Sequence, residues 1–95
     1  MDEIVSKGDR IKVEYMVSLT SGQVIDQSKG RGPLEFKVGG GEMIKGFDDA
    51  VVGMKLNQEK TVTVAPENAY GTKKGSHPLA GQTLIFWIKV VEIEK

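Results

Sequence analysis

The sequence contains no cysteine and only one histidine. Disulfides, thiolate nucleophiles and cysteine metal sites are therefore excluded, and a single imidazole cannot build a multi-histidine metal centre. We expect neither a metal nor a cofactor. Lys and Arg together number 13, and so do Asp and Glu, so the formal net charge is zero. This balance provides no basic surface for a phosphate backbone, and it disfavours nucleic acid as a partner.

The chain also lacks any apolar run near the roughly 20 residues that a membrane-spanning helix needs. It starts with the acidic sequence Met1-Asp2-Glu3 rather than with the basic segment of a signal peptide. We therefore expect a soluble cytoplasmic protein with no membrane partner. Zero net charge without an obvious apolar seam predicts a monomer.

The composition that remains is that of one small globular domain. Of the 95 residues, 39% are hydrophobic and 27% are charged, which suits one compact core and a soluble surface. The length is too small for two independent cores. A single domain over residues 1–95 is predicted.

Alternating apolar and polar residues predict that most of the chain forms β-strands. Residues 11–19 place five apolar side chains on one face, as a half-buried antiparallel strand does. Turn residues at 20–22 predict that this strand forms a hairpin with the next one. Strands are predicted at residues 11–19, 24–26, 34–38, 59–65 and 83–93.

The last predicted strand has apolar residues on both faces, which is typical of a central strand. Strict alternation puts Leu84, Phe86, Ile88 and Val90 on one face and Ile85, Trp87, Val91 and Ile93 on the other.

One segment has a helical period instead. Phe47, Ala50, Val51 and Met54 recur at the spacing of a helix that lies on a sheet. Asp48 and Asp49 are expected in its first turn, where negative charge suits the helix dipole, and Gly53 is expected to end it. The predicted fold is α+β: a curled antiparallel sheet of about five strands wrapped around one short helix.

Few residues suggest conventional catalysis. Gly39-Gly40-Gly41 lacks the Gly-Lys-Ser/Thr ending of a phosphate loop, so phosphate binding is rejected in favour of a flexible connection. Asp26 ends an apolar strand beside a Gly-rich loop, where an aspartate is more often a turn residue than a catalyst. His77 is expected to be an exposed loop imidazole with no partner that the sequence identifies.

The aromatic residues form the more informative set. A curled sheet with a helix in its concavity would bring several of them together, although each alone could be an ordinary core residue. Two are tyrosines, whose hydroxyls need partners when they are buried. The sequence therefore suggests an apolar cup with a few polar tips, as in small-molecule and peptide pockets. The set comprises Tyr15, Phe36, Phe47, Tyr70 and Phe86.

An ordered series of short motifs runs through essentially the whole chain. It comprises Tyr15, Val24-Ile25-Asp26, Pro33-Leu34-Glu35-Phe36, Gly41-Glu42-Met43-Ile44-Lys45-Gly46-Phe47-Asp48, Gly53-Met54, Ala69-Tyr70-Gly71 and Leu84-Ile85-Phe86. Single pieces such as Ala-Tyr-Gly are weak signals, but the ordered set with this spacing is specific. It resembles the FKBP-type peptidyl-prolyl cis-trans isomerases, also called rotamases.

The segment from His77 to Phe86 is similar to the SlyD-like and archaeal short branch of that family. In this branch an inserted chaperone lobe normally lies between the Ala-Tyr-Gly turn and the His-x-Leu-Ala-Gly segment. Here only residues 72–76 separate the two, so the resemblance implies a short flap over residues 72–82 without the lobe. Such a flap is compatible with a natural short form and with an engineered deletion.

The resemblance implies specific roles for the matching residues. Asp26 would be a buried carboxylate paired with the Tyr15 hydroxyl, the Ile44 backbone N–H would donate to the substrate, and the Tyr70 hydroxyl would contact a substrate carbonyl. Those three residues, Asp26, Ile44 and Tyr70, form the catalytic set. The substrate-binding set comprises Tyr15, Ile25, Leu34, Phe36, Met43, Phe47, Leu79 and Phe86, with Phe47 as the floor.

Three positions depart from the family pattern. Phe47 stands where many relatives have Trp, Leu34 where some have another aromatic residue, and Ile25 where they have Phe. The cup is therefore less aromatic than in those relatives. This difference bears more on the binding of macrolide inhibitors of the tacrolimus and rapamycin type than on catalysis.

The function that the resemblance implies is isomerisation of X-Pro bonds in proline-containing peptides and unfolded proteins. A non-catalytic alternative is a module that grips proline-containing or hydrophobic peptides, or a chaperone-type domain that needs its missing lobe. A third alternative is a β-grasp-like interaction domain with an ordinary core and no pocket.

Overall fold

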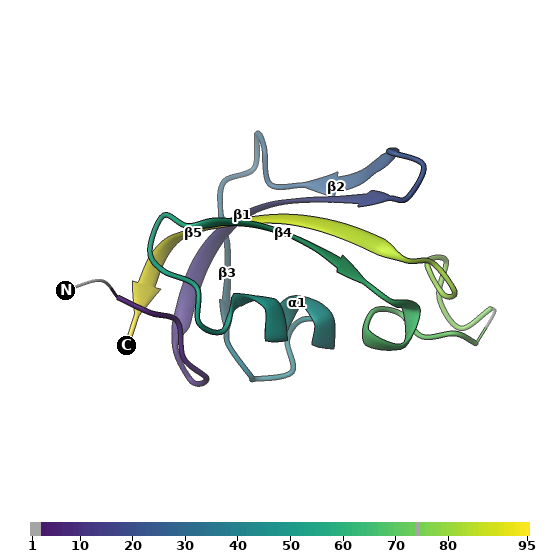
Figure 1. The fold of residues 1–95 in the computed structure, drawn as a ribbon. Coiled ribbons are helices and arrows are strands. Elements are labelled where there is room, and N and C mark those ends of the chain that lie inside the picture. Colours follow the sequence, from purple (N-terminus) through teal and green to yellow (C-terminus); the bar gives the residue numbers. More distant parts are fainter. Residues whose placement is uncertain (1–2, 74) are drawn as a thin grey trace.

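The computed structural model describes residues 3–73 and 75–95. Met1 and Asp2, and Lys74 within the predicted flap, lie outside the described residues. The elements follow in the order β1 (Arg10–Leu19), β2 (Val24–Gln27), β3 (Leu34–Lys37), α1 (Lys45–Val51), β4 (Glu59–Val64), the 3₁₀ turn η1 (Pro66–Asn68) and β5 (Leu84–Glu94) (Figure 1).

The five strands form one antiparallel sheet in which the order is β2-β1-β5-β4. β3 also pairs with β1, along residues 10–13, whereas β2 pairs with residues 16–18. The two short strands therefore share one edge of β1, and the loop between them, residues 28–33, lies beside that edge. The predicted fold class is confirmed, and β5 has the central position that its apolar residues on both faces indicated.

A β-bulge in β5 corrects the predicted alternation at its end. Lys12 pairs with Glu92 but Val13 pairs with Val90, so Val91 is an extra residue in β5. An extra residue exchanges the faces of all side chains beyond it. Ile93, predicted to share a face with Ile85 and Trp87, is consequently in the core and only 8% exposed.

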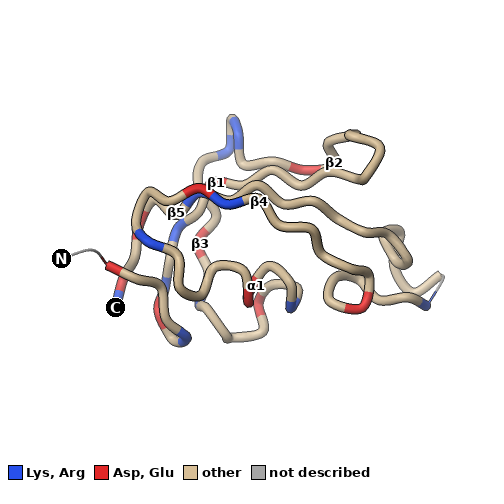
Figure 2. The backbone as a smooth tube through the Cα atoms, in the orientation of Figure 1, with Lys and Arg blue, Asp and Glu red and all other residues tan. Residues whose placement is uncertain are grey.

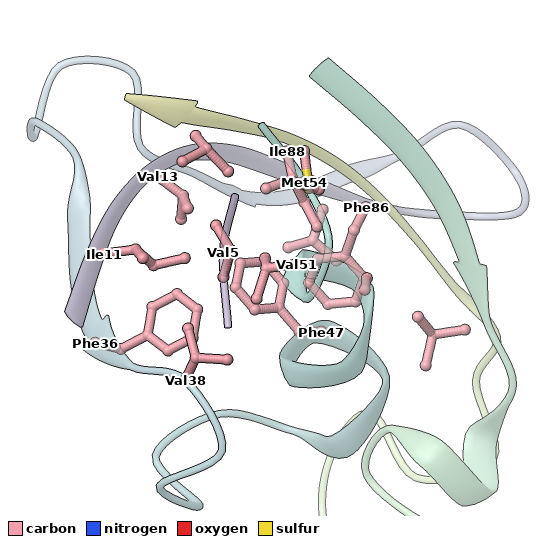
Figure 3. Close-up of a cluster of buried hydrophobic side chains, with 14 of the residues drawn as sticks. Val5, Ile11, Val13, Phe36, Val38, Phe47, Val51, Met54, Phe86 and Ile88 are labelled. Atoms are coloured by element: carbon pink, nitrogen blue, oxygen red, sulfur yellow. The ribbon is translucent and has the colours of Figure 1, made fainter. Parts of the chain in front are cut away.

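α1 packs into the concave face of the curved sheet (Figure 1). α1 buries Phe47, Ala50 and Val51, and Figure 3 shows Phe47 and Val51 among side chains from the strands. The helix is shorter than predicted, so Met54 is buried beyond its end. Gly53 follows it with a φ of 87°, a left-handed conformation that suits glycine at a helix end.

Two further details concern charge. Only Asp48 lies in the first turn of α1; Asp49 instead forms an ion pair with Lys45 one turn earlier. Acidic and basic residues are intermixed along the tube in Figure 2, in keeping with the balanced composition.

Among the helices of the described chain, none has the length and apolarity to cross a membrane.

Candidate functional site

A cavity of about 370 Å³ opens between α1, the sheet and the loops that precede and follow them. Its lining is mostly apolar, with a carboxylate and two phenols as polar tips. The lining residues are Tyr15, Val17, Ile25, Asp26, Leu34, Met43, Phe47, Tyr70, Leu79, Leu84 and Phe86. The structure thus brings together nine of the eleven predicted site residues from seven separate segments of the chain. Val17 and Leu84 are additional.

The floor of the pocket is a cluster of aromatic rings centred on Phe47. The Phe47 ring lies 5.2 Å from that of Phe86 and 6.4 Å from that of Tyr15, in both cases nearly edge-to-face. Its other neighbour is Phe36, at 5.5 Å. Edge-to-face contacts match the positive edge of one ring to the negative face of the next, which favours one fixed arrangement. The floor is therefore held by ring contacts on several sides.

Phe36 was predicted as a wall residue, but it is not among the residues that line the pocket. It is 1% exposed and lies in the core behind Phe47. The reason is the pairing of β3 with β1, in which Phe36 is opposite the fully buried Ile11 (Figure 3). Phe36 supports the floor from below rather than facing a ligand.

Ile44 is also absent from the lining, although the prediction for it concerned its backbone. Its carbonyl accepts hydrogen bonds from the N–H groups of Phe47 and Asp48 and so begins α1. Within residues 3–73 and 75–95, its own N–H donates to no acceptor. The amide that precedes the helix is thus available to a ligand, next to the lining residue Met43.

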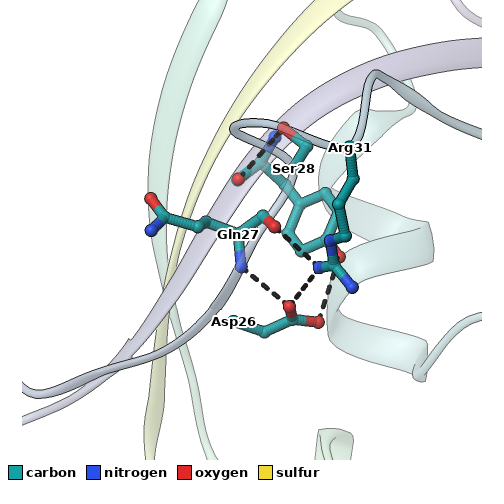
Figure 4. Close-up of polar contacts among 5 residues, drawn as sticks. Asp26, Gln27, Ser28 and Arg31 are labelled. Carbon is teal, nitrogen blue, oxygen red and sulfur yellow. Dashed lines mark hydrogen bonds and ion pairs between the residues drawn. The ribbon is translucent and has the colours of Figure 1, made fainter.

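Asp26 is not buried as predicted; its side chain is 49% exposed. It lies on β2, a short strand at the edge of the sheet. Both carboxylate oxygens nevertheless accept hydrogen bonds (Figure 4). Tyr15 Oη donates to Oδ2 at 3.0 Å, the Gln27 N–H donates to Oδ1 at 2.8 Å, and Arg31 forms an ion pair with Oδ1.

These contacts set the protonation states at this end of the pocket. Partial desolvation of Asp26 acts to raise its pKa, but the hydrogen bonds from Tyr15 and Gln27 and the charge of Arg31 together outweigh it and lower the pKa. Burial raises the pKa of Tyr15, and the neighbouring carboxylate raises it further. The pair therefore stays as a neutral phenol donating to an ionised carboxylate.

Arg31 was not identified from the sequence. Besides Asp26, its guanidinium donates to the carbonyl of Gln27 at 2.6 Å and to Tyr15 Oη at 3.0 Å (Figure 4). Its position results from the loop after β2, which is folded by three hydrogen bonds between Ser28 and the backbone of Tyr15. No periodic pattern marks such a loop contact. The only sequence signal is a cation five residues after the carboxylate.

Tyr70, just before the flap, and Leu79, within it, both line the pocket. The Tyr70 hydroxyl has no hydrogen-bond partner among the described residues and is free to contact a ligand. His77, predicted to be exposed without a partner, is exposed but stacks on the Tyr70 ring, with centroids 4.1 Å apart and planes inclined by 7°. The sequence contained no signal for this stack beyond the proximity of the two residues.

Other candidate sites are less well formed. A hollow of about 500 Å³ is larger and more open, and it is lined by Glu14, Met16, Lys29 and Trp87 among others. Of the predicted site residues only Tyr15 borders it, so the smaller cavity is the better site. In the described part of the chain, no three His, Asp or Glu side chains gather in a way that could hold a metal ion.

Comparison with known proteins gives a consistent result over the whole chain. The family model described as FKBP-type peptidyl-prolyl cis-trans isomerase matches residues 1–91. FK506-binding protein 1A of Neurospora crassa is 43% identical over 90 residues, which cover 93% of this chain and 75% of that protein. A short-type peptidyl-prolyl cis-trans isomerase of Methanocaldococcus jannaschii is 39% identical over 87 residues, which cover 77% of this chain and 55% of that protein.

Several similar proteins are much longer. FK506-binding protein 4 of Mycosarcoma maydis is 41% identical over 87 residues, and the match covers 92% of this chain but 23% of that protein. In FK506-binding protein 4 of Chaetomium thermophilum the matched share is 19%. The chain thus spans about a fifth of the length of these two relatives.

Proposed function

The chain belongs to the FKBP-type peptidyl-prolyl cis-trans isomerase family, and from this premise we propose that it catalyses rotation about X-Pro bonds in flexible or unfolded chains. The observation that carries the proposal is the apolar cavity of about 370 Å³ with an aromatic floor and a few polar groups at its rim. Its size and lining suit a proline ring and the residue that precedes it.

The reaction needs no nucleophile, because no covalent bond is broken. Resonance holds the X-Pro bond planar against a barrier of about 18–20 kcal/mol, and unaided isomerisation takes roughly tens to hundreds of seconds. An acceleration of about four decades requires a barrier lower by only ~5–6 kcal/mol. Rotation destroys the amide resonance, so the twisted bond is less polar than the planar amide. A water-poor pocket therefore favours the transition state over the ground state.

Two polar groups are placed to orient the substrate. The Ile44 N–H and the Tyr70 hydroxyl are both without protein partners in the described residues and can bond to substrate carbonyls. Asp26 contributes an ionised group held by Tyr15 and Arg31 at the rim. In this scheme the carboxylate keeps Tyr15 in place and does not transfer a proton. The rate then comes from desolvation and orientation.

A protease-free isomerisation assay on a short peptide with one X-Pro bond tests the proposal. We expect the chain to accelerate the approach to the cis–trans equilibrium in proportion to its concentration. Tyr70→Phe keeps the ring and loses one neutral hydrogen bond, typically worth ~0.5–1.5 kcal/mol, so activity should fall by roughly tenfold or less. Peptide binding without any acceleration would replace the proposal with the non-catalytic binding module.

We propose that the chain belongs to the SlyD-like and archaeal short branch, which the similarity to the short-type archaeal isomerase supports. We also propose that it works as a monomer in the cytoplasm and without the chaperone lobe. Sedimentation at micromolar concentration tests the monomer: a species of twice the chain mass would contradict it.

Macrolides of the tacrolimus and rapamycin type are proposed as competing ligands. Support comes from the names of the relatives and from the pocket that would hold a proline-like ring. Because Ile25 and Leu34 supply aliphatic rather than aromatic walls, we expect macrolide affinity to rise when either is replaced by Phe. Titration of the chain with FK506, followed by the loss of isomerase activity, measures this affinity.

A further inference from the structure

The flap beside the pocket contains a side chain that contacts two pocket residues at once (described residues 72–73 and 75–82, green in Figure 1). The imidazole of His77 stacks on the phenol of Tyr70 at a centroid distance of 4.1 Å. Its Nδ1 accepts a hydrogen bond from the Leu79 N–H at 3.0 Å. Tyr70 and Leu79 both line the cavity, whereas His77 does not.

We propose that His77 is a positioning residue for the isomerase reaction: its ring holds the Tyr70 phenol, and its Nδ1 holds Leu79 against the pocket. The effect on turnover rests on the proposed function. The two contacts themselves are properties of the free protein and can be tested without a substrate.

The backbone around Tyr70 is already fixed by other groups. The Gly71 N–H donates to the carbonyl of Pro66 at 2.8 Å, and the Gly71 carbonyl accepts from the Gly81 N–H at 2.7 Å, which closes the flap. These backbone bonds do not fix the direction of the Tyr70 side chain. Its hydroxyl bonds to none of the described residues. The parallel stack on His77 restricts one face of the ring, and this restriction orients the hydroxyl.

The contact with Leu79 depends on one nitrogen of the imidazole. Because Nδ1 accepts the hydrogen bond, the neutral ring carries its proton on Nε2. Pro78 separates His77 from Leu79 and has a fixed φ, so the bond closes a short, stiff turn. This turn sets the direction in which Leu79 leaves the backbone toward the cavity.

Two substitutions separate the two contacts. His77→Phe keeps an aromatic ring for the stack but removes the acceptor for the Leu79 N–H. His77→Asn removes the ring but keeps an acceptor, because an Asn side chain can bond to the N–H two residues later. Ser76→Ala is the control: it removes an exposed hydrogen bond to the Lys73 carbonyl in the same loop and touches neither contact.

The two variants should affect different kinetic parameters on a short X-Pro peptide. A side chain such as Leu79 contacts the substrate equally in the ground and transition states, so His77→Phe should raise KM about two- to tenfold with little change in kcat. Tyr70 orients the substrate for rotation, so His77→Asn should lower kcat by about two- to tenfold. Ser76→Ala should match the wild type in both parameters.

Three outcomes would overturn the proposal. They are unchanged kinetics in both His77 variants, the same parameter changed equally in both, and a loss in Ser76→Ala as large as theirs. The last result would mean that any loosening of the flap has the same effect.

Amide hydrogen exchange and ring chemical shifts test the two contacts of His77 independently of isomerase activity. Exchange of the Leu79 N–H should be faster in His77→Phe than in the wild type, and close to the wild type in His77→Asn. The Tyr70 ring protons should lose the ring-current shift from His77 in His77→Asn alone. An inactive wild type would refute the proposed isomerase function, while these spectra would still show whether His77 fixes Tyr70 and Leu79.

Discussion

Gly46, in the first turn of α1, is the position where the smallest change should have the largest effect. A Cβ added there would lie 2.3 Å from Val64 Cγ1 and 2.9 Å from Val64 Cγ2. Both distances are shorter than carbon atoms tolerate without bonding. Val64 is 4% exposed on β4 and is branched at Cβ, so it has neither the space nor the rotamers to move aside. The helix itself would have to shift away from the sheet.

The expected cost of Gly46→Ala follows from two opposing terms. Ala is favoured over Gly in a helix by up to ~1 kcal/mol, whereas overpacking a closed core costs about 1–3 kcal/mol or more. The overlap with Val64 is severe, and the side chain of Val64 has few rotamers. We therefore expect the overpacking to outweigh the helix preference, with a net loss of roughly 2 kcal/mol in the free energy of unfolding. In a domain of this length that loss lowers Tm by about 8–16 °C. The next residue is Phe47, so peptide affinity should fall as well.

A double-mutant cycle with Val64→Ala isolates the cause. Val64→Ala alone should cost about 2 kcal/mol, for the lost methyl groups and the space they leave. The double variant should be about as stable as Val64→Ala alone, because the space then accepts the new Cβ. Gly40→Ala is the matched control, since its Cβ would meet no atom closer than 3.2 Å. Strict additivity in urea denaturation would refute the steric argument.

Three further predictions concern the pocket and its chemistry. Phe47→Ala should cost ~3–5 kcal/mol in chemical denaturation and weaken peptide binding; a neutral effect on both would place Phe47 outside the site. Because the pKa of Asp26 is lowered, the stabilising contacts of its carboxylate are lost only when the pH falls through that lowered pKa. Because the pKa of Tyr15 is raised, its phenol stays neutral until the pH rises through that raised pKa. In a His77→Phe background the peptide rate should thus be flat from about pH 6 to 8, and a bell-shaped profile would indicate proton transfer. Without the chaperone lobe, proline-limited refolding of a whole protein should be accelerated far less than peptide turnover; equal acceleration would mean that another surface captures unfolded chains.

The sequence predicted the fold well because its information is periodic. Strands with alternating side chains and a short helix with a 3.6-residue period have only a few ways to bury their apolar faces in 95 residues. The one error in register, at Ile93, came from a bulge, and a bulge depends on the fit between β5 and β1 rather than on local sequence.

The candidate site was predicted less completely, for a different reason. Periodicity indicates which face of a strand or helix a residue occupies, but it does not indicate how deeply the side chain is buried. Phe36 was therefore taken for a wall when it lies behind Phe47, and Asp26 was taken for a buried group when it lies on an edge strand. Arg31 and His77 belong to loops whose paths are set by individual hydrogen bonds. Their partners become visible only in three dimensions.

Tyr15 connects the two parts of the site that the sequence treated separately. Its ring packs edge-to-face on Phe47, and its hydroxyl donates to Asp26 while it accepts from Arg31. The apolar floor and the charged rim therefore share one side chain. A displacement of α1 that moves Phe47 should also disturb the bond between Tyr15 and Asp26, because the phenol cannot follow the floor and keep its distance to the strand. We therefore expect Gly46→Ala, which displaces α1, to weaken the contacts that raise the pKa of Tyr15, and an unchanged ultraviolet titration of this phenol would refute the connection.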